Sequence, residues 1–273
     1  TVLMRQRRTD TAESLRGIWE TASWNGIEIF RPLLGVKRAK LRQYLSHLDQ
    51  PWIDDPSNFD VSYERVRLRS ELASEDARME ALAGIAAAAG HEARRLAKAA
   101  KDWNLQHLKS YPEGYGIVPR PEFSKLGADI QQRALQQLIM LFGAGTRVDP
   151  QELVEACKWI AGHSLSRRTL GGAVLATRKQ SIVVGREAGR ISSESVFVPQ
   201  TGEIVWDGRF LINAPPDSQV VPVARLKKLE RRPDIPNFVE LALPAALLGE
   251  NTVAVPHLGL GEGVSAKFIR CLR

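Results

Sequence analysis

The stretch that decides the fold runs from residue 27 to residue 69 and reads IEIFRPLLGVKRAKLRQYLSHLDQPWIDDPSNFDVSYERVRLR. The apolar run at 27–30 predicts a strand that ends at Arg-Pro, because proline cannot donate to a ladder. Apolar residues at helical spacing over 36–48 predict a helix, and Pro51 ends it. Asp-Pro-Ser-Asn at 55–58 is typical of a rigid turn. An arginine-rich helix is expected over 62–72.

Three arginines in that last helix are candidates for binding phosphate. Arg65 and Arg69 are four residues apart, so their guanidinium groups share one helix face, whereas Arg67 points elsewhere. Guanidinium groups donate in planar, bidentate fashion to phosphate oxygens, which suits a polyphosphate or an RNA backbone. The alternative is a solvated helix face whose arginines form salt bridges to neighbouring carboxylates. Those would be Asp54, Asp55 or Glu64.

A long helix is expected over 74–109, where apolar residues recur at steps of three and four and the other positions are charged. We interpret it as a connector, because composition changes on either side of it. Proline and glycine break up residues 111–120, and residues 9–26 have the composition of a loop. Helical segments follow at 122–142 and from Asp149-Pro150 to about residue 160, with Asp149 as N-cap.

The pattern of apolar residues changes after residue 165. Alternating apolar residues predict a strand pair over 168–177 and 181–185, with Gly171-Gly172 inside it. Further strands are expected over 202–212 and 220–223, and helical pieces over 224–231 and 238–248. Trp159 and Trp206 could stack on bases, but large aromatic residues of this kind more often lie in the core.

The composition narrows the class of protein. The chain has 273 residues, 44% of them hydrophobic, and a formal net charge of +7, which favours an anionic partner. No run of about 18 apolar residues occurs, so we expect no membrane span and no membrane partner. Cys157 and Cys271 have no partner at zinc-ligand spacing, which predicts free thiols in a reducing cytoplasm and no metal site. No Ser–His or Cys–His spacing indicates a triad, and nothing specifies an oligomeric state.

Paired basic residues near the ends of expected strands and helices are candidates for contacts with nucleic-acid phosphates. Each could equally be ordinary solvated charge. The pairs are Arg167-Arg168, Arg178-Lys179, Lys227-Lys228 and Arg231-Arg232, and Arg94 and Arg95, with Lys98 and Lys101, form a further strip on the long helix.

The order RPLL, helix, WIDDPSN and YERVRLR resembles the end of the catalytic domain of the tRNA(Ile)-lysidine synthetases, in the PP-loop ATP pyrophosphatase superfamily. Thr1-Val-Leu-Met-Arg5 resembles the tail of that family's D-D-Q-x-E-T-x-L-x-R motif, and Leu15-Arg-Gly-Ile18 the stretch that follows. This sequence departs from the family pattern at two places. Val66 stands where the family's R-N-R-x-R has asparagine, and Arg8 is followed by Thr9 where the family has Arg-Gly. The likeness is diffuse over 120–190 and faint beyond 195.

The resemblance implies ATP-dependent ligation of free L-lysine to C2 of the wobble cytidine of tRNA(Ile) with a CAU anticodon, using ATP and Mg²⁺. It implies catalytic roles for Arg5, Arg65 and Arg69, and tRNA binding by Arg67 and the basic pairs. The family's ATP loop, S-G-G-x-D-S, is absent from the sequence. Because Thr1–Arg5 also begins in mid-helix without an N-cap, we expect an N-terminally truncated chain that is inactive alone.

We therefore predict an α+β multidomain chain. Residues 1–72 would be the remnant of an α/β PP-loop domain of the adenine nucleotide alpha hydrolase-like type. A connector helix over 73–110, a helical tRNA-binding domain with a strand pair over 111–190 and a small mixed α/β domain over 191–273 would follow. The alternatives are a non-catalytic RNA-binding module and another PP-loop tRNA-modifying enzyme such as a thiolase, which scattered cysteines disfavour.

Overall fold

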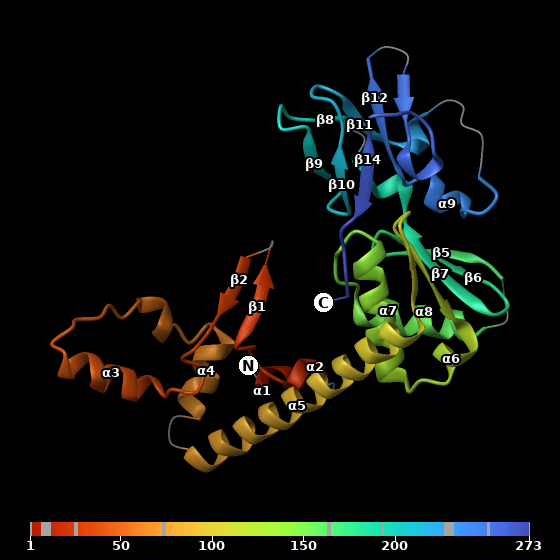
Figure 1. Cartoon of the computed structure of the whole chain (residues 1–273). Helices are drawn as coiled ribbons and strands as arrows, with labels where there is room; N and C mark the ends of the chain where they lie inside the picture. Colours follow the sequence, from red (N-terminus) through yellow and green to blue (C-terminus); the bar gives the residue numbers. More distant parts are fainter. Residues whose placement is uncertain are drawn as a thin grey trace. The chain divides into compact units, whose positions relative to one another are not determined.

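The computed structural model describes residues 2–6, 12–24, 27–72, 75–162, 165–192, 194–226, 232–249 and 252–272. The chain is an α+β protein, and its contacts form two compact units, Thr1–Arg95 and Leu96–Arg273. Helix α5 (Asp76–His107) contributes residues to both (Figure 1). The finer division at residues 72, 110 and 190 stays a prediction. Within the described residues, no helix has both the length and the apolar composition needed to cross a membrane.

The first unit follows the order expected over 27–72. Its elements are α1 (Val2–Gln6), α2 (Ala12–Leu15), β1 (Thr21–Trp24), β2 (Ile27–Phe30), α3 (Arg38–His47), η1 (Pro56–Phe59) and α4 (Glu64–Glu71). Strands β1 and β2 pair antiparallel. The expectation of a loop over 9–26 was wrong for its described part, because α2 and β1 lie there. The partner strand β2 supplies the ladder that β1 needs, and the sequence of β1 alone does not signal it.

The second unit contains a five-stranded antiparallel sheet in the order β3-β4-β7-β6-β5. Its strands are β3 (Lys109–Tyr111), β4 (Tyr115–Pro119), β5 (Arg167–Leu170), β6 (Ala173–Thr177) and β7 (Ser181–Arg186). The expected single strand over 168–177 is two strands, because Gly171 and Gly172 both adopt positive φ and form the turn between them. The segment 111–120, expected to be broken, is a hairpin whose turn is Pro112–Gly114.

Both faces of this sheet are buried, and alternate residues of β6 and β7 serve different cores. Leu175 and Ile182 pack with the helices α6 (Arg120–Ser124), α7 (Ala128–Phe142) and α8 (Pro150–Ala161). Val174 and Val183 pack instead with the C-terminal residues. The sheet is therefore the middle layer of the second unit.

The C-terminal layer consists of two small antiparallel sheets, in the orders β14-β10-β9 and β13-β12-β11-β8. Its elements are η2 (Ala188–Arg190), β8 (Val196–Phe197), β9 (Glu203–Trp206), β10 (Phe210–Asn213), β11 (Gln219–Pro222), η3 (Val223–Arg225), α9 (Asn237–Glu240), β12 (Pro244–Leu248), β13 (Thr252–Ala254), η4 (Pro256–Leu258) and β14 (Ser265–Phe268). The helix expected over 238–248 was wrong in its second half, where β12 pairs with β11. The alanine and leucine composition of β12 favours a helix, but its pairing with β11 outweighs that local preference.

Gly116 lets helix α7 approach strand β4 closely. A Cβ at this position would lie 2.5 Å from Cε2 of Phe142 and 2.6 Å from Cδ1 of Leu108. We expect Gly116→Ala to lower the free energy of unfolding by about 1–3 kcal/mol, because both neighbours are packed and cannot move away freely. Urea unfolding measures the loss. Gly189→Ala, where a Cβ would meet nothing within 4 Å, is the matched control and should change stability by less than about 0.5 kcal/mol. Equal losses would contradict this account.

Candidate nucleic-acid interface

The Asp-Pro-Ser-Asn turn has the expected local geometry. The carboxylate of Asp55 accepts a hydrogen bond of 2.8 Å from the backbone N–H of Ser57, and this contact is the first cause of its lowered pKa. The preceding carboxylate, Asp54, instead pairs with two arginines of α3, Arg38 at 2.9 Å and Arg42 at 2.5 Å. Asp54 is thus committed to α3 rather than to the arginines of α4.

Helix α4 presents its arginines as the spacing predicts. Val66 and Leu68 are buried, whereas Arg65, Arg67 and Arg69 are exposed. Arg67 donates to the carbonyl oxygens of Val61 at 2.6 Å and Ser62 at 2.7 Å, so it holds the segment before its own helix.

Arg65 and Arg69 keep their donors for another partner. The Arg65 guanidinium carbon lies 5.5 Å from the ring centroid of Tyr63, and neither arginine forms an ion pair with a carboxylate of a described residue. Neither arginine forms an ion pair with Asp54 or Asp55, although the charge of Arg65 is one of the causes that lower the pKa of Asp55. Their cationic edges are available to a phosphate-bearing ligand.

Arg5 has a different environment from Arg65 and Arg69. Its Nη1 donates to the carbonyl oxygens of Ser14 and Gly17, each at 3.0 Å. These contacts tie α1 to α2 and to the residues just after it, which is a positioning role within the first unit. Its proposed catalytic role stays a prediction.

Large apolar side chains are exposed along the same stretch of the first unit. Ile53 is 94% exposed, and several other large apolar residues are more than half exposed. They are Ile27, Phe30, Leu33, Tyr44, Leu48, Phe59 and Val61. Exposed apolar surface on this scale marks an interaction surface.

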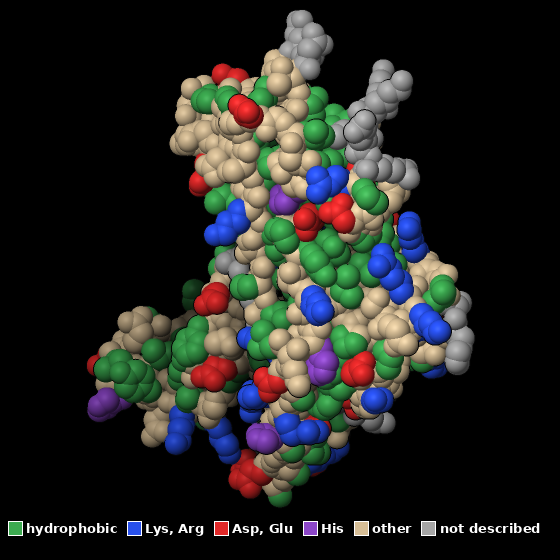
Figure 2. Space-filling view, turned by 45° about the vertical axis from the view of Figure 1, so that its right-hand side comes forward, with side chains coloured by type: hydrophobic (Ala, Val, Ile, Leu, Met, Phe, Trp, Pro, Cys, Tyr) green, Lys and Arg blue, Asp and Glu red, His purple; other side chains and the backbone are tan. Residues whose placement is uncertain are grey.

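The basic candidates on α5 are partly neutralised by their own helix. Arg95 forms a bidentate pair with Glu92, with both contacts at 2.7 Å, and Lys98 pairs with Asp102 at 2.6 Å. Arg94 is exposed. On the face shown in Figure 2, lysine and arginine side chains lie in separate groups, several of them beside acidic side chains.

The two arginines at the start of β5 lie on opposite faces of the sheet, as consecutive strand residues must. The Arg167 guanidinium carbon lies 5.4 Å from the ring centroid of Phe238, and Arg168 Nη2 lies 3.5 Å from Glu155 Oε2. The structure therefore does not bring Arg167 and Arg168 together.

Arg178 and Lys179 are the most accessible of the paired candidates. Both are exposed in the turn between β6 and β7, and neither side chain pairs with a carboxylate in the part of the chain that is described. Arg232 pairs with Asp234 at 3.2 Å, which raises the pKa of Arg232. Lys227, Lys228 and Arg231 lie outside the described residues. Trp206 is 3% exposed, so the core interpretation of that residue is confirmed.

A buried ion network in the second unit was not expected from the sequence. The Asp207 carboxylate accepts from Arg186 at 2.9 and 3.0 Å and from Arg209 at 2.6 Å. Asp207 and Gly208 both have positive φ in the turn between β9 and β10. The Asp-Gly dipeptide was the available signal, because it is a strong marker of such a hairpin turn.

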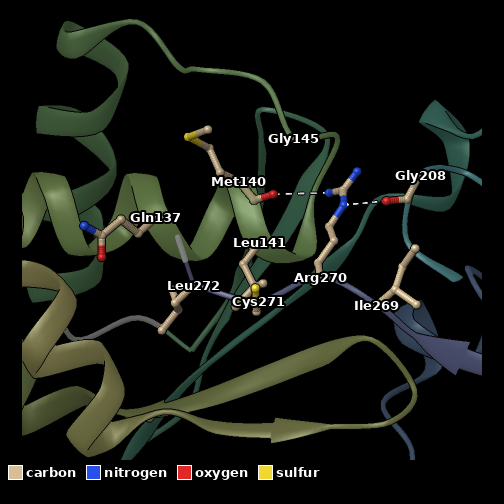
Figure 3. Close-up of a pocket in the computed structure, with 9 residues that line it drawn as sticks. All are labelled: Gln137, Met140, Leu141, Gly145, Gly208, Ile269, Arg270, Cys271 and Leu272. Atoms are coloured by element: carbon tan, nitrogen blue, oxygen red, sulfur yellow. Dashed lines mark hydrogen bonds between the residues drawn. The ribbon is translucent and has the colours of Figure 1, made fainter. Parts of the chain in front are cut away.

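The network extends to the chain after β14. Arg270 Nε donates to the carbonyl of Gly208 at 2.8 Å, and its Nη1 donates to the carbonyls of Met140 at 3.2 Å and Gly143 at 2.8 Å. A cavity of about 380 Å³ lies beside it (Figure 3). Its lining residues are Gln137, Met140, Leu141, Gly145, Gly208, Ile269, Arg270, Cys271 and Leu272.

Among the described residues, no group of three or more His, Cys, Asp or Glu that could hold a metal occurs. Gly171 and Gly172 lie in a crowded turn, where added Cβ atoms would come within 2.7 Å of side-chain atoms of Val148, Ile139, Ala144 and Arg186. The phosphate-binding role of the α4 arginines stays a prediction.

We expect the stability of the second unit to depend more on the carboxylate of Asp207 than on its other carboxylates. Burial raises its pKa, but hydrogen bonds and charges of Arg186 and Arg209 outweigh burial and leave the pKa below its usual value. Its stabilisation is therefore present above the unfolded pKa of about 3.9 and is lost as pH falls through the lower folded pKa. We expect Asp207→Asn to lower the free energy of unfolding at pH 7 by about 3–5 kcal/mol, because two buried guanidinium groups lose their counter-charge.

Urea unfolding between pH 2 and pH 7 measures this effect. Asp217→Asn is the matched control, since Asp217 also has positive φ, at 62°, but is exposed. The control should change stability by less than about 0.5 kcal/mol. If the two variants unfold alike at pH 7, the network does not stabilise the second unit as described.

Comparisons with known proteins show what the sequence of the chain is similar to. A family model described as a PP-loop domain matches residues 1–76. A tRNA(Ile)-lysidine synthase of Ruegeria pomeroyi is 28% identical over 291 residues, which cover 98% of this chain and 65% of that protein. A tRNA(Ile)-lysidine synthase of Bartonella quintana is 31% identical over 217 residues, covering 75% of this chain and 43% of the relative. One of Wolbachia pipientis is 28% identical over 291 residues, covering 100% and 66%. The chain thus spans about two thirds of the length of relatives that it matches throughout.

Proposed function

We propose that this chain, a relative of the tRNA(Ile)-lysidine synthases with a PP-loop domain match over residues 1–76, is the tRNA-binding portion of an enzyme that ligates lysine to C2 of the wobble cytidine of tRNA(Ile). The observation that carries the proposal is the pairing of that match with Arg65 and Arg69, which are exposed on one face of α4. ATP activates the cytidine in such a reaction, with Mg²⁺ neutralising its phosphates, and the amine of free lysine is the nucleophile.

In this proposal, the two α4 arginines contact the anionic end of the nucleotide. Buried Val66 and Leu68 fix the helix, so the flanking Arg65 and Arg69 are exposed at a set spacing. The nucleotide-binding loop itself is supplied by a part of the enzyme that lies outside the present sequence, which holds no S-G-G-x-D-S. The exposed apolar side chains around Ile53 pack against that part.

The second unit supplies the phosphate contacts that hold the tRNA. Arg178 and Lys179 in the β6–β7 turn carry this role best, because their charges are exposed, and the exposed Arg94 on α5 adds a contact from the first unit. Arg95, Arg168 and Arg232 already pair with carboxylates and contribute less. Binding would be electrostatic and would carry no base specificity of its own.

Incorporation of labelled lysine into a tRNA(Ile) transcript with a CAU anticodon tests the proposed reaction. The full-length protein should transfer lysine in the presence of ATP, and the present chain alone should not. In the full-length protein, Arg65→Gln and Arg69→Gln should each lower the rate by about 100-fold or more, since each removes a donor from developing phosphate charge. Arg38→Gln, an exposed arginine paired with Asp54, is the control and should retain most activity.

Two results would overturn this proposal. A full-length protein that fails to transfer lysine removes the reaction itself. If the present chain alone transfers lysine, the reaction does not require a nucleotide-binding loop from another part of the enzyme.

Gel-shift titration of the chain with tRNA against salt tests the phosphate contacts. We expect log K to fall linearly with log salt, and Arg178→Gln with Lys179→Gln to reduce the slope by about 1 for each lost contact. Arg95→Gln is the control, because Glu92 already neutralises that charge, and it should leave the slope nearly unchanged. A salt-independent affinity in the unmodified chain would argue against phosphate contacts altogether.

A further inference from the structure

The cavity beside Arg270 has a cationic wall and no acidic residue in its lining. It lies between the end of α7, the β9–β10 turn and the chain after β14. Figure 3 shows the Arg270 side chain reaching across it toward Met140 and Gly208. A volume of about 380 Å³ is large enough for a phosphate group and part of the sugar that carries it.

Arg270 retains donors after it has been fixed in place. Nε and Nη1 make the three carbonyl contacts described above, and Nη2 makes none with a described residue. Cβ atoms at Gly145 and Gly208 would each lie 3.3 Å from Nη2. Because both positions are glycine, no side chain covers this edge of the guanidinium group.

Charge around the cavity is positive and incompletely compensated. The guanidinium groups of Arg186 and Arg209 pair with the single carboxylate of Asp207, and Arg270 lies near enough for Asp207 and Arg186 to shift its pKa. Both carboxylate oxygens are already used by Arg186 and Arg209. Burial lowers the pKa of Arg270, and the charge of Arg186 lowers it further against the opposing effect of Asp207. An anion next to Nη2 would offset this excess, whereas the carbonyl oxygens at the C-terminal end of α7 oppose anion binding and are already used by Nη1.

We propose that this cavity binds a backbone phosphate of RNA, which accepts hydrogen bonds from Arg270 Nη2 between Gly145 and Gly208. Anion binding follows from the geometry of the cavity alone, whereas RNA as the source of the phosphate rests on the proposed function. The site would add one fixed phosphate contact on the side of the second unit that carries the C-terminal residues.

Cys271 provides a native reporter of occupancy. It is an exposed free thiol in the lining of the cavity. The other cysteine, Cys157, is buried, and burial raises its pKa to about 11, so it remains a thiol at pH 8 and reacts slowly. Alkylation of Cys271 by iodoacetamide, followed by peptide mass spectrometry, therefore measures access to the cavity.

The experiment compares inorganic phosphate, tRNA and chloride at equal ionic strength. With ligand at about ten times its dissociation constant, mass action predicts roughly tenfold slower alkylation of Cys271 with phosphate or tRNA. Chloride should give no protection. An unchanged rate with both phosphate and tRNA would overturn the site.

Variants that change the charge of an exposed lining residue test whether Arg270 binds an anion or only holds the surrounding carbonyls in place. Ile269 is 42% exposed, so both Ile269→Glu and Ile269→Gln should fold, and circular dichroism checks that they do. Ile269→Glu places a carboxylate at the wall and should abolish protection of Cys271 and reduce the salt slope of tRNA binding by about 1. Ile269→Gln, which is isosteric and neutral, should retain both. Equal behaviour of the two variants would mean that Arg270 is only a structural clamp.

The outcomes distinguish this site from the proposed function. If tRNA binds in gel shifts but leaves Cys271 unprotected, the cavity is not an RNA contact, and the proposed function stands. If phosphate protects Cys271 but tRNA neither binds nor protects, the RNA assignment is overturned together with the proposed tRNA-binding role. Protection by both, lost only in Ile269→Glu, supports the site.

Discussion

The second unit depends on a sheet that must be covered on both faces. Every residue of β6 is buried, and alternate residues enter two different hydrophobic clusters. Covering one face with α6, α7 and α8 would leave Val174 and Val183 in water, at a cost of about 25 cal/mol for each Å² of apolar surface. The C-terminal layer supplies the second cover, and for this reason residues 96–273 form one compact unit.

Two-sided burial also encloses a charged residue at the end of β7. Arg186 is the last residue of β7, at the point where the sheet meets the β9–β10 turn. Its guanidinium group cannot reach bulk water there, so it requires Asp207, and Asp207 in turn holds Arg209. Arg270 then joins the same turn to the end of α7. Polar contacts thereby fix the seam between the layers while apolar contacts stabilise their centres.

Local chemistry made parts of the chain predictable from sequence. The strand at 27–30, the helices α3 and α4, the Asx turn at Asp55 and the N-cap Asp149 follow from periodicity and short-range hydrogen bonds. The predictions of secondary structure were wrong where a segment becomes a strand by pairing with residues far away in the sequence. β12 is helical by composition, yet it pairs with β11, and the 111–120 hairpin is completed by pairing of β4 with β7. No local signal encodes those partners.

The sequence alone was likewise insufficient to predict which charged side chains of the candidate interface are accessible. Sequence spacing placed Arg65 and Arg69 on one helix face, but it could not show which other arginines are already paired. Arg67 binds carbonyl oxygens, Arg95 binds Glu92, and Arg5 binds carbonyl oxygens in and just after α2. Net charge therefore overstates the cationic surface that a nucleic acid would meet, because much of it serves the fold. Conversely, a site can arise from residues that sequence analysis passes over, since Arg270, Gly145 and Gly208 are brought together only by the packing of the layers.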